Sequence, residues 1–490
     1  MITRIRIKGF KNLYDVDLEL GPFTCIAGVN AVGKSNLFDA FKFLGVLASE
    51  KLVDAARSVR SEGQKASELR DIFFKTNNSC SRKIFFEVDL IIPPSGEDDL
   101  GERAEASITS VKYVLELKLN SGVDGIDFIS IVKEELMPIN QQNAKKGIKY
   151  KNAPSWRNSV ISGRRSASAP FISTPSKKDP IVIRLHQDQQ KGKPFDRNPD
   201  KMGRTVLSTV SAEFPTAYLV KEEFRSWTQL QLEPTALRMS DDLDFFRSAK
   251  ISADGSHMPA TLYKLKNEQV HRDIYQEVTN RLAELIDDIS ELWVDKDEKR
   301  QLLTLILKTK DGSEIPARSL SDGTLRFLAL TLIEADPRSG RILCLEEPEN
   351  GIHPRKIDDI ITLLRDIAFD SFHPFDEENP VRQVIINTHS PLVVQHVPED
   401  SLLIAESEEL FDHLNEEVVR QTSFKHLPGT WRDESDATIP VSGIGMVLSY
   451  LGEGEGLSRL YDKYSSENQK RVIDRNDVQS VSRQTSLFGE

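Results

Sequence analysis

The stretch Gly28-Val29-Asn30-Ala31-Val32-Gly33-Lys34-Ser35 decides the fold of this chain. It fits the pattern G-x-x-x-x-G-K-[ST], in which glycines let backbone N–H groups close around phosphates. The apolar residues 23–27 before it are typical of a buried strand, and the pattern of residues 36–46 after it predicts a helix. The N-terminus of that helix adds its positive end to the same place. We therefore expect a strand–loop–helix unit that binds the phosphates of a nucleotide.

The side chains of the loop have separate expected roles. Lys34 is expected to reach the β- and γ-phosphates, and the Ser35 hydroxyl is expected to bind Mg²⁺. Asn30, Gly33 and Asn36 complete the expected nucleotide-binding set. The alternative is a glycine-rich turn that matches the pattern by chance, and the flanking strand and helix patterns argue against it.

The composition limits the class of protein. A length of 490 residues allows two or three domains, and a net charge of −12 argues against a uniformly basic nucleic-acid binder. Three cysteines give no disulfide or zinc framework and favour a reducing cytoplasm. No apolar run is long enough to span a membrane, so we expect a cytoplasmic protein that does not contact membranes.

The first third of the chain has strand patterns around the loop. Residues 2–8 alternate apolar and polar side chains, and residues 16–20 form a second strand-like run. Three further runs, at 83–92, 111–119 and 126–137, have hairpin-like spacing. This spacing predicts an antiparallel sheet layered on the nucleotide-binding core.

Residues 139–205 differ in composition from the rest of the chain. They are rich in Ser, Pro, Gln and Lys, and basic residues such as Arg164, Arg165, Lys177 and Lys178 far outnumber acidic ones. Two interpretations stay open here. The segment is either a flexible, solvated insert or an arm that binds the phosphate backbone of DNA. After it, the spacing of Ile274, Val278, Leu282, Leu285 and Ile286 predicts helix.

A second group of motifs lies between residues 319 and 391. The small residues Ser321 and Gly323 precede an expected helix, whose N-terminus makes another anion site. Residues 342–347 read as a buried strand that ends in Glu346 and Glu347. One of these carboxylates would hold Mg²⁺, and the other would act as general base toward the attacking water. The alternatives are an ordinary helix cap and a solvated strand end.

A histidine completes this second group of motifs. Residues 350–354 form a tight loop, and residues 384–391 give another buried strand that ends at His389. A lone histidine at a strand end is more often structural. Its place after the other motifs favours a contact with the γ-phosphate or the attacking water.

In this order the motifs resemble the ABC-type ATPases of the SMC, RecF and OLD-like group, and especially small bacterial ATPases with an AAA-type label. Residues 28–35 correspond to Walker A, and residues 320–323 to the signature motif, with Asp322 in a usual Gly place. Residues 342–347 correspond to Walker B, with Glu346 where Asp is commoner. Residues 350–354 look like the D-loop. The resemblance covers residues 1–120 and 300–405, and the glutamine-bearing loop of the family is not placed.

The resemblance implies a fold, an activity and an assembly. The fold is α/β: a P-loop ABC-type ATPase head with a mixed central sheet, an antiparallel β layer and a helical and insert region. The activity is hydrolysis of ATP, with Glu347 and His389 catalytic and with Ser35 and Glu346 on Mg²⁺. In a homodimer or higher even oligomer, Ser321 and Gly323 of one protomer face the ATP of the other.

The same resemblance implies a division of the chain. The expected parts are the first part of the head (1–138), the basic insert (139–205), a helical subdomain (206–300), the second part of the head (301–405), a C-terminal extension (406–465) and a disordered tail (466–490). The extension lacks the Asp-x-Asp pair of nuclease-bearing relatives, so no nuclease activity is expected in this chain. The tail contains Gln484-Thr485-Ser486-Leu487-Phe488, which resembles a peptide that binds the bacterial sliding clamp. An inert tail is the alternative.

Three functional hypotheses remain open from the sequence. The first is the sensor and motor of a bacterial anti-phage defence module with a separately encoded effector, a nuclease or toxin. The second is a RecF-like DNA repair ATPase that clamps DNA. The third is an ATP-held scaffold with little turnover.

Overall fold

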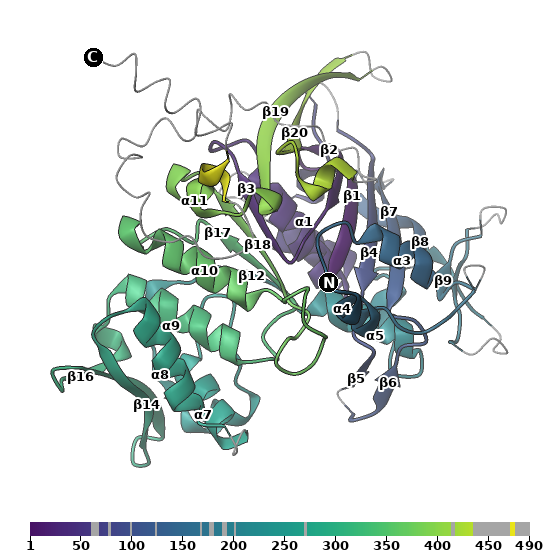
Figure 1. Cartoon of the computed structure of the whole chain (residues 1–490). Coiled ribbons are helices and arrows are strands. Elements are labelled where there is room, and N and C mark those ends of the chain that lie inside the picture. Colours follow the sequence, from purple (N-terminus) through teal and green to yellow (C-terminus); the bar gives the residue numbers. More distant parts are fainter. Residues whose placement is uncertain are drawn as a thin grey trace, which may run out of the picture. The chain divides into compact units, whose positions relative to one another are not determined.

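The computed structural model describes residues 1–59, 68–76, 80–98, 100–122, 125–166, 169–175, 181–188, 194–199, 202–268, 272–412, 417–434 and 471–475. These residues form two compact units. The first is made from the described residues of Met1–Trp227, Ser371–Phe375 and Glu399–Val447, and the second from those of Thr228–Asp370, Asp376–Pro398 and Leu448–Glu490. The fold is mixed α/β, which confirms the predicted class (Figure 1).

The first unit contains an eight-stranded sheet in which neighbouring strands run antiparallel, in the order β11-β10-β9-β8-β7-β4-β1-β2. The strands are β1 (Ile2–Phe10), β2 (Leu13–Glu19), β4 (Lys83–Ile91), β7 (Ser110–Ser121), β8 (Asp127–Pro138), β9 (Ile172–Ser173), β10 (Ile183–Leu185) and β11 (Phe195–Arg197). Alternation in β1 turns Ile5 and Ile7 into the core, and Ile5 lies opposite Val88. The predicted antiparallel layer is confirmed by β4, β7 and β8. A short hairpin, β5 (Ser95–Glu97) and β6 (Arg103–Glu105), lies beside them in sequence.

A second group of strands in the same unit carries the phosphate-binding loop. Strand β3 (Phe23–Ala27) runs parallel to β19 (Leu402–Asp412), with Cys25 opposite Leu402, and β19 pairs antiparallel with β20 (Glu417–His426). All five residues of β3 are buried, as the apolar run predicts. The loop leads into α1 (Lys34–Leu47), which contacts α2 (Leu52–Ser58) and α5 (Pro215–Arg225).

An aromatic cluster ties α1 to the antiparallel sheet. The rings of Phe10, Phe43 and Phe86 come from β1, α1 and β4, and their centroids lie 5.6, 5.6 and 5.8 Å apart. All three side chains are fully buried. The helix that follows the phosphate-binding loop is therefore anchored by ring packing as well as by its own hydrogen bonds.

The described part of residues 139–205 is folded onto this sheet. It contains α3 (Gln141–Gly147), α4 (Pro154–Val160) and the strands β9, β10 and β11, and it buries Trp156 and Phe171 completely. Leu136 of β8 pairs with Ile172, so β9 extends the sheet. This arrangement differs from the solvated insert that the composition suggests, because apolar side chains spaced among the basic ones supply a buried face. The predicted domain boundaries stay predictions.

Glu134 is a carboxyl group buried inside the first unit. It is 0% exposed and accepts hydrogen bonds from Val206 N (2.7 Å), Leu207 N (2.9 Å) and the Tyr113 hydroxyl (3.1 Å). Burial raises the pKa of Glu134 to about 7, although the three donors act to lower it. The carboxyl group therefore fixes the chain around residue 206 to strand β8.

The second unit combines a parallel strand pair, a small antiparallel sheet and helices. Its helices are α6 (Pro234–Leu237), α7 (Met258–Glu268), α8 (Ile274–Leu285), α9 (Asp322–Ala335), α10 (Ile357–Ile367) and α11 (Pro391–His396). Its strands are β13 (Asp241–Asp242), β14 (Ile289–Asp297), β15 (Leu302–Thr309), β16 (Glu314–Pro316), β17 (Ile342–Glu346) and β18 (Gln383–Thr388). Strands β17 and β18 are parallel, with Glu346 opposite Asn387. Helix α8 buries Ile274, Val278 and Leu282, as their spacing predicts.

The structure can be compared with the remaining sequence-based expectations only where its residues are described. None of the helices among those residues is both long and apolar enough to cross a membrane. Lys177, Lys178 and the peptide at 484–488 lie outside the described residues.

We expect the free energy of unfolding to fall as the pH rises from about 4.5 to about 7, by on the order of 2 kcal/mol. In that range the folded state binds the Glu134 proton more tightly than the unfolded state does, so raising the pH favours unfolding. In Glu134→Gln this part of the pH dependence should disappear. Urea unfolding across this pH range measures it, with Glu135→Gln, on the other face of β8, as control. An unchanged slope in Glu134→Gln would contradict the expectation.

Candidate functional site

The phosphate-binding loop connects β3 to α1 in the first unit and accepts only glycine at two positions. A Cβ on Gly28 would lie 2.8 Å from the Ala405 carbonyl oxygen. Gly33 has φ +105°, and its Cβ would overlap the Asn12 side-chain amide. Gly33 is also the residue directly before α1, so the left-handed turn and the helix N-terminus coincide.

Lys34 lies inside the curl of this loop. Its side chain is largely buried, and Nζ donates hydrogen bonds to the carbonyl oxygens of Gly28 (2.5 Å) and Val29 (3.0 Å). Ser35 and Asn36 follow in the first turn of α1. The ammonium group, the helix N-terminus and the Ser35 hydroxyl are thus gathered at one turn, as binding of a nucleotide phosphate requires.

Residues from distant parts of the first unit hold the loop in shape. Asn36 Nδ2 donates to Asn12 Oδ1 (2.6 Å), and Asn12 Nδ2 donates to the Val32 carbonyl (3.1 Å). The Thr422 hydroxyl donates to the same Val32 carbonyl (2.6 Å). Three polar residues, Asn12, Asn36 and Thr422, thus hold the loop backbone in shape.

The paired acids stand at the carboxyl end of β17 in the second unit. Glu347 has φ +46°, an unusual conformation for a residue other than glycine. Its backbone N–H donates to the Asn387 carbonyl (2.9 Å), which fixes the turn against the end of β18. Its carboxylate contacts His389 Nδ1 through Oε1 (2.7 Å) and accepts from Asn350 Nδ2 through Oε2 (2.8 Å). The structure therefore brings Glu347 and His389 together, and it adds Asn350.

Glu346 has a partner that the sequence did not reveal. Gln229, in β12 (Trp227–Leu230), donates from Nε2 to Glu346 Oε1 at 3.0 Å. The stretch Thr-Gln-Leu-Gln at 228–231 offers two glutamines before the helical region, and the sequence alone does not say which one faces the acids. We expect Gln229 to fill the role of the glutamine that the family resemblance left unplaced.

A buried pair supports the loops behind these acids. The Thr388 hydroxyl donates to Glu349 Oε1 (2.5 Å) and accepts from the Ser390 N–H (2.9 Å). Burial raises the pKa of Glu349, and the Thr388 hydrogen bond lowers it. The pair links the loop after β17 to the turn that carries His389.

The signature residues begin α9 in the same unit. Ser321 is the N-cap, and its hydroxyl accepts from the Thr324 N–H (3.2 Å). A Cβ on Gly323 would lie 3.3 Å from the Gly351 carbonyl oxygen, so this helix start lies close against the loop after β17. Ser321 and Gly323 therefore belong to the same local structure as Glu347.

Asp322, in the usual Gly place, is paired with a cation. Arg238, just after α6, donates to the Leu320 carbonyl (3.0 Å) and forms an ion pair with the Asp322 carboxylate. About half of the Asp322 side chain and a third of the Arg238 side chain are exposed. The guanidinium thus offsets the negative charge that the aspartate places at this helix start.

The predicted site residues fall into two groups. Asn30, Gly33, Lys34, Ser35 and Asn36 lie in the first unit, and the acids, His389 and the signature residues lie in the second. A hydroxyl and a carboxylate, Ser35 and Glu346, are ligand types that Mg²⁺ takes alongside water and phosphate oxygens. Among the described residues no group of three or more His, Cys, Asp or Glu side chains is placed to hold a metal by itself.

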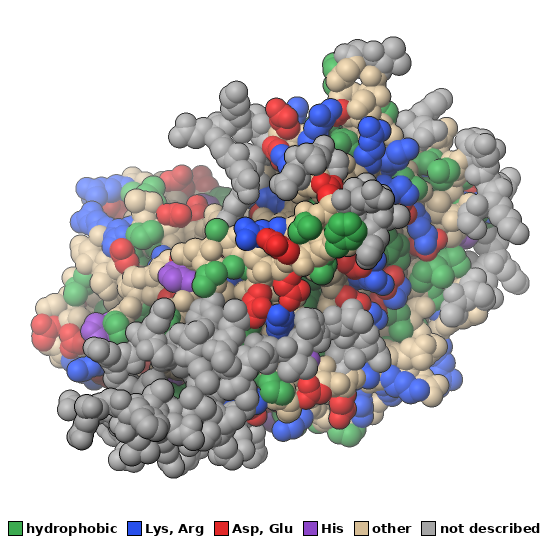
Figure 2. Space-filling view, turned by 90° about the horizontal axis from the view of Figure 1, so that it is seen from above, with side chains coloured by type: hydrophobic (Ala, Val, Ile, Leu, Met, Phe, Trp, Pro, Cys, Tyr) green, Lys and Arg blue, Asp and Glu red, His purple; other side chains and the backbone are tan. Residues whose placement is uncertain are grey.

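The basic segment 139–205 uses one of its predicted DNA-contacting residues internally. Arg165 donates to the carbonyls of Ala169 (2.7 Å) and Asp188 (2.5 Å), and its guanidinium lies 4.0 Å from the Phe171 ring centroid. On the face shown in Figure 2, the basic and acidic side chains of the described residues are interspersed. A DNA contact through Arg165 would require these internal bonds to break.

Part of the chain matches a known family model. Residues 206–395 match the model described as "AAA domain, putative AbiEii toxin, Type IV TA system". The match contains Glu346, Glu347, His389 and the signature residues, and it confirms the AAA-type resemblance for this part. The match covers fewer than half of the residues of this chain. Together with the phosphate-binding loop, which lies outside it, the match supports a P-loop ATPase. No curated protein matches the sequence.

Solved SMC head domains are distantly similar to this chain. An SMC head bound to the C-terminal winged-helix domain of ScpA is 14% identical, with 87% of this chain and 98% of that chain covered and a TM-score of 0.42. The SMC head domain from Thermotoga maritima is 12% identical, with 86% and 97% covered and a TM-score of 0.36. A head with an extended coiled coil bound to the ScpA C-terminal domain, from Pyrococcus furiosus, is 11% identical, with 87% and 96% covered and a TM-score of 0.42. At these TM-scores the similarities carry no argument about this chain.

We expect Glu347→Gly to be more stable than Glu347→Ala by about 1 kcal/mol. Both variants lose the contacts with His389 and Asn350, so the difference isolates the backbone strain at φ +46°. Thermal unfolding of the two variants measures it. Equal stabilities would mean that the left-handed turn at Glu347 is not maintained in solution.

Proposed function

We propose that this ATPase binds ATP with Mg²⁺ and hydrolyses it with Glu347 as the general base. The observation that carries the proposal is the arrangement around Glu347, whose two carboxylate oxygens contact His389 and Asn350 at the end of a buried strand. A base held at both oxygens is oriented before substrate arrives, which is what activation of a water molecule requires.

The other residues take roles that follow from their chemistry. Lys34 and the loop N–H groups bind the β- and γ-phosphates, with Asn30, Gly33 and Asn36 shaping the loop. Ser35 and Glu346 would hold Mg²⁺, which neutralises phosphate charge when bound, and Gln229 orients Glu346. His389 contacts the γ-phosphate or the attacking water and keeps Glu347 in position.

The assembly in this proposal is an ATP-sandwich homodimer or a higher even oligomer. Ser321 caps α9, and Ser321 and Asp322 are exposed, so the N-terminus of this helix is available to an anion from a second protomer. ATP then closes the dimer and hydrolysis opens it, because only the closed form gains the contacts with phosphate.

The biological role in this proposal is the sensor and motor of an anti-phage defence module with a separate effector. The family model that matches residues 206–395 is described as a putative toxin of a type IV toxin–antitoxin system, which supports a role in such a module. The separate effector is part of the proposal and does not rest on this description. A DNA-clamping repair ATPase and an ATP-held scaffold are the competing functions. The first experiment below separates a DNA-responsive ATPase from a scaffold or a sensor of another trigger, by DNA dependence and turnover.

We expect Glu347→Gln to keep ATP binding and to lower steady-state ATP hydrolysis about 10²–10⁴-fold, because the amide cannot accept the proton of water. Lys34→Ala should instead lose ATP binding. Hydrolysis is measured with and without duplex DNA for the wild type and both variants. Turnover in Glu347→Gln equal to wild type would show that another residue is the base.

The measurements with and without DNA distinguish a DNA-responsive ATPase from an ATPase that does not respond to DNA. Strong stimulation by duplex DNA, absent in Glu347→Gln, would favour a DNA-responsive ATPase, whether in repair or in defence. Slow hydrolysis that DNA leaves unchanged would favour the scaffold, or a sensor of another trigger.

We also expect Arg238→Ala to lower both ATP hydrolysis and ATP-dependent dimerisation by about tenfold, because it leaves the Asp322 charge facing phosphate. Asp322→Gly, which removes that charge, should restore both in the Arg238→Ala background. Steady-state turnover measures the effect on hydrolysis. Sedimentation velocity measures the effect on dimerisation, with Glu347→Gln added to each variant so that the ATP-bound dimer is trapped. A double variant as defective as Arg238→Ala alone would exclude charge compensation.

A further inference from the structure

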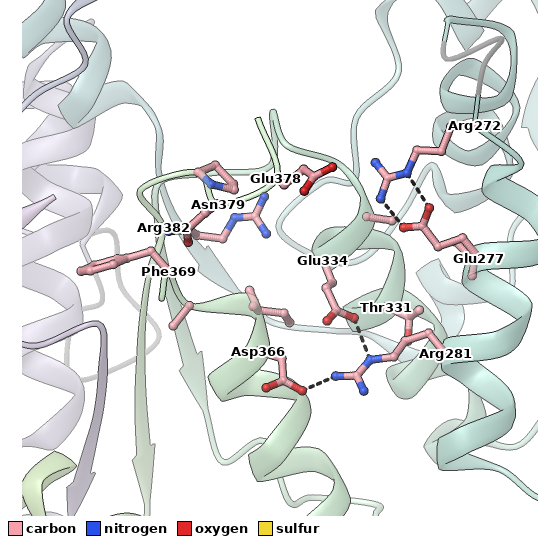
Figure 3. Close-up of a pocket in the computed structure, with 15 residues that line it drawn as sticks. Arg272, Glu277, Arg281, Thr331, Glu334, Asp366, Phe369, Glu378, Asn379 and Arg382 are labelled. Carbon is pink, nitrogen blue, oxygen red and sulfur yellow. Dashed lines mark hydrogen bonds and ion pairs between the residues drawn. The ribbon is translucent and has the colours of Figure 1, made fainter. Parts of the chain in front are cut away.

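A pocket of about 280 Å³ lies inside the second unit, and none of its lining residues belongs to the candidate site. Its walls come from Arg272, α8, α9, α10 and the residues Ala368, Phe369, Glu378, Asn379, Pro380 and Arg382 (Figure 3). The volume is at the small end of ligand pockets and suits a small metabolite rather than a nucleotide.

Arg382 is a buried cation in this pocket with unused hydrogen-bond donors. Its side chain is 3% exposed, and its only hydrogen bond with a described residue runs from Nη2 to the Asp336 carbonyl (2.7 Å). Nε is buried and has no acceptor in the part of the chain that the structure describes. Figure 3 shows the guanidinium projecting into the pocket. A buried guanidinium with an unsatisfied N–H donor is unfavourable, and an anionic group on a ligand would relieve this.

The other two guanidinium groups of the pocket already have carboxylate partners. Arg281 Nε contacts Glu334 Oε2 (3.1 Å), and its Nη2 pairs with Asp366. Arg272 pairs with Glu277. The dashed lines in Figure 3 mark these pairs. Arg382 forms no ion pair with a described residue, although the charges of Asp336 and Glu334 also act on it, so it is the cation of this pocket that is most available to a ligand. Burial lowers its pKa only to about 10 and leaves it charged at neutral pH.

The charges of the other lining residues limit which anionic ligand the pocket can bind. The pocket holds four carboxylates against three guanidinium groups, with Glu378 as the additional acid. This surplus repels a dianion and attracts a cationic group on the same ligand. The rest of the lining combines the polar residues Thr331 and Asn379 with an apolar wall, which is formed by Val278, Ala335, Ile367, Ala368, Phe369 and Pro380.

We propose that this pocket binds a free α-amino acid with an apolar side chain. The carboxylate lies on Arg382, because a guanidinium matches a carboxylate in two parallel hydrogen bonds. The ammonium group faces Glu378, and the side chain packs on the apolar wall. This proposal goes beyond the ATPase activity and does not depend on it.

Binding to the full chain is measured by isothermal titration calorimetry with L-valine, L-leucine, L-isoleucine, L-methionine and L-phenylalanine. For leucine, 3-methylbutylamine lacks the carboxylate and 4-methylpentanoate lacks the ammonium group. At least one of the five amino acids should bind. The two leucine analogues, each of which carries only one of the two charged groups, should bind at least about tenfold more weakly than leucine. No binding by any of the five would overturn the proposal. Inorganic phosphate or 4-methylpentanoate binding as tightly as leucine would also overturn it.

Variants locate the binding. Arg382→Gln and Glu378→Gln should each weaken the amino acid about tenfold or more. Glu377→Gln, exposed and adjacent but outside the pocket, is the matched control and should leave binding unchanged. If Arg382→Gln does not fold, the exposed Glu378→Gln decides. Unchanged binding in Glu378→Gln would contradict the assigned site.

Discussion

The parallel register of β17 and β18 is the constraint on which the part of the candidate site around Glu347 depends. Glu346 lies opposite Asn387, so the next residues of both strands leave the sheet at the same edge. Buried apolar strands cannot carry charged side chains within their length, and the acids and the histidine therefore collect where the strands end. The backbone bond from Glu347 to Asn387 then turns the acid toward His389. Chemistry at this edge follows from strand pairing rather than from any one side chain.

Both halves of the candidate site are held by contacts that do not involve a ligand. The loop around Lys34 is fixed by Asn12 and Thr422, and the turn around Glu347 keeps a left-handed residue that only surrounding hydrogen bonds make tolerable. This is preorganisation: the free energy for shaping the site is supplied during folding, so it does not weaken binding of the substrate.

Much of the fold follows from patterns of local sequence. The apolar run before the loop, the alternation of β1 and the helical spacing of α8 each predicted an element that the structure contains. Gln229 was not predictable, because a polar residue at a strand end becomes informative only when its neighbour in space is known. The burial of Trp156 and Phe171 was missed for a related reason. Composition averages over a segment, whereas folding depends on where its few large apolar side chains fall.

The pairing of β3 with β19 has a consequence for the order in which the protein forms. The strand that carries the phosphate-binding loop is synthesised near the start of the chain, but its parallel partner begins at Leu402. The Thr422 hydroxyl that holds the Val32 carbonyl lies 390 positions later in the sequence. During synthesis on the ribosome, most of the chain must therefore be made before the loop can form its contacts with β19 and Thr422. A nascent chain would gain full affinity for nucleotide only late in synthesis, which ties competence for ATP to completion of the first unit.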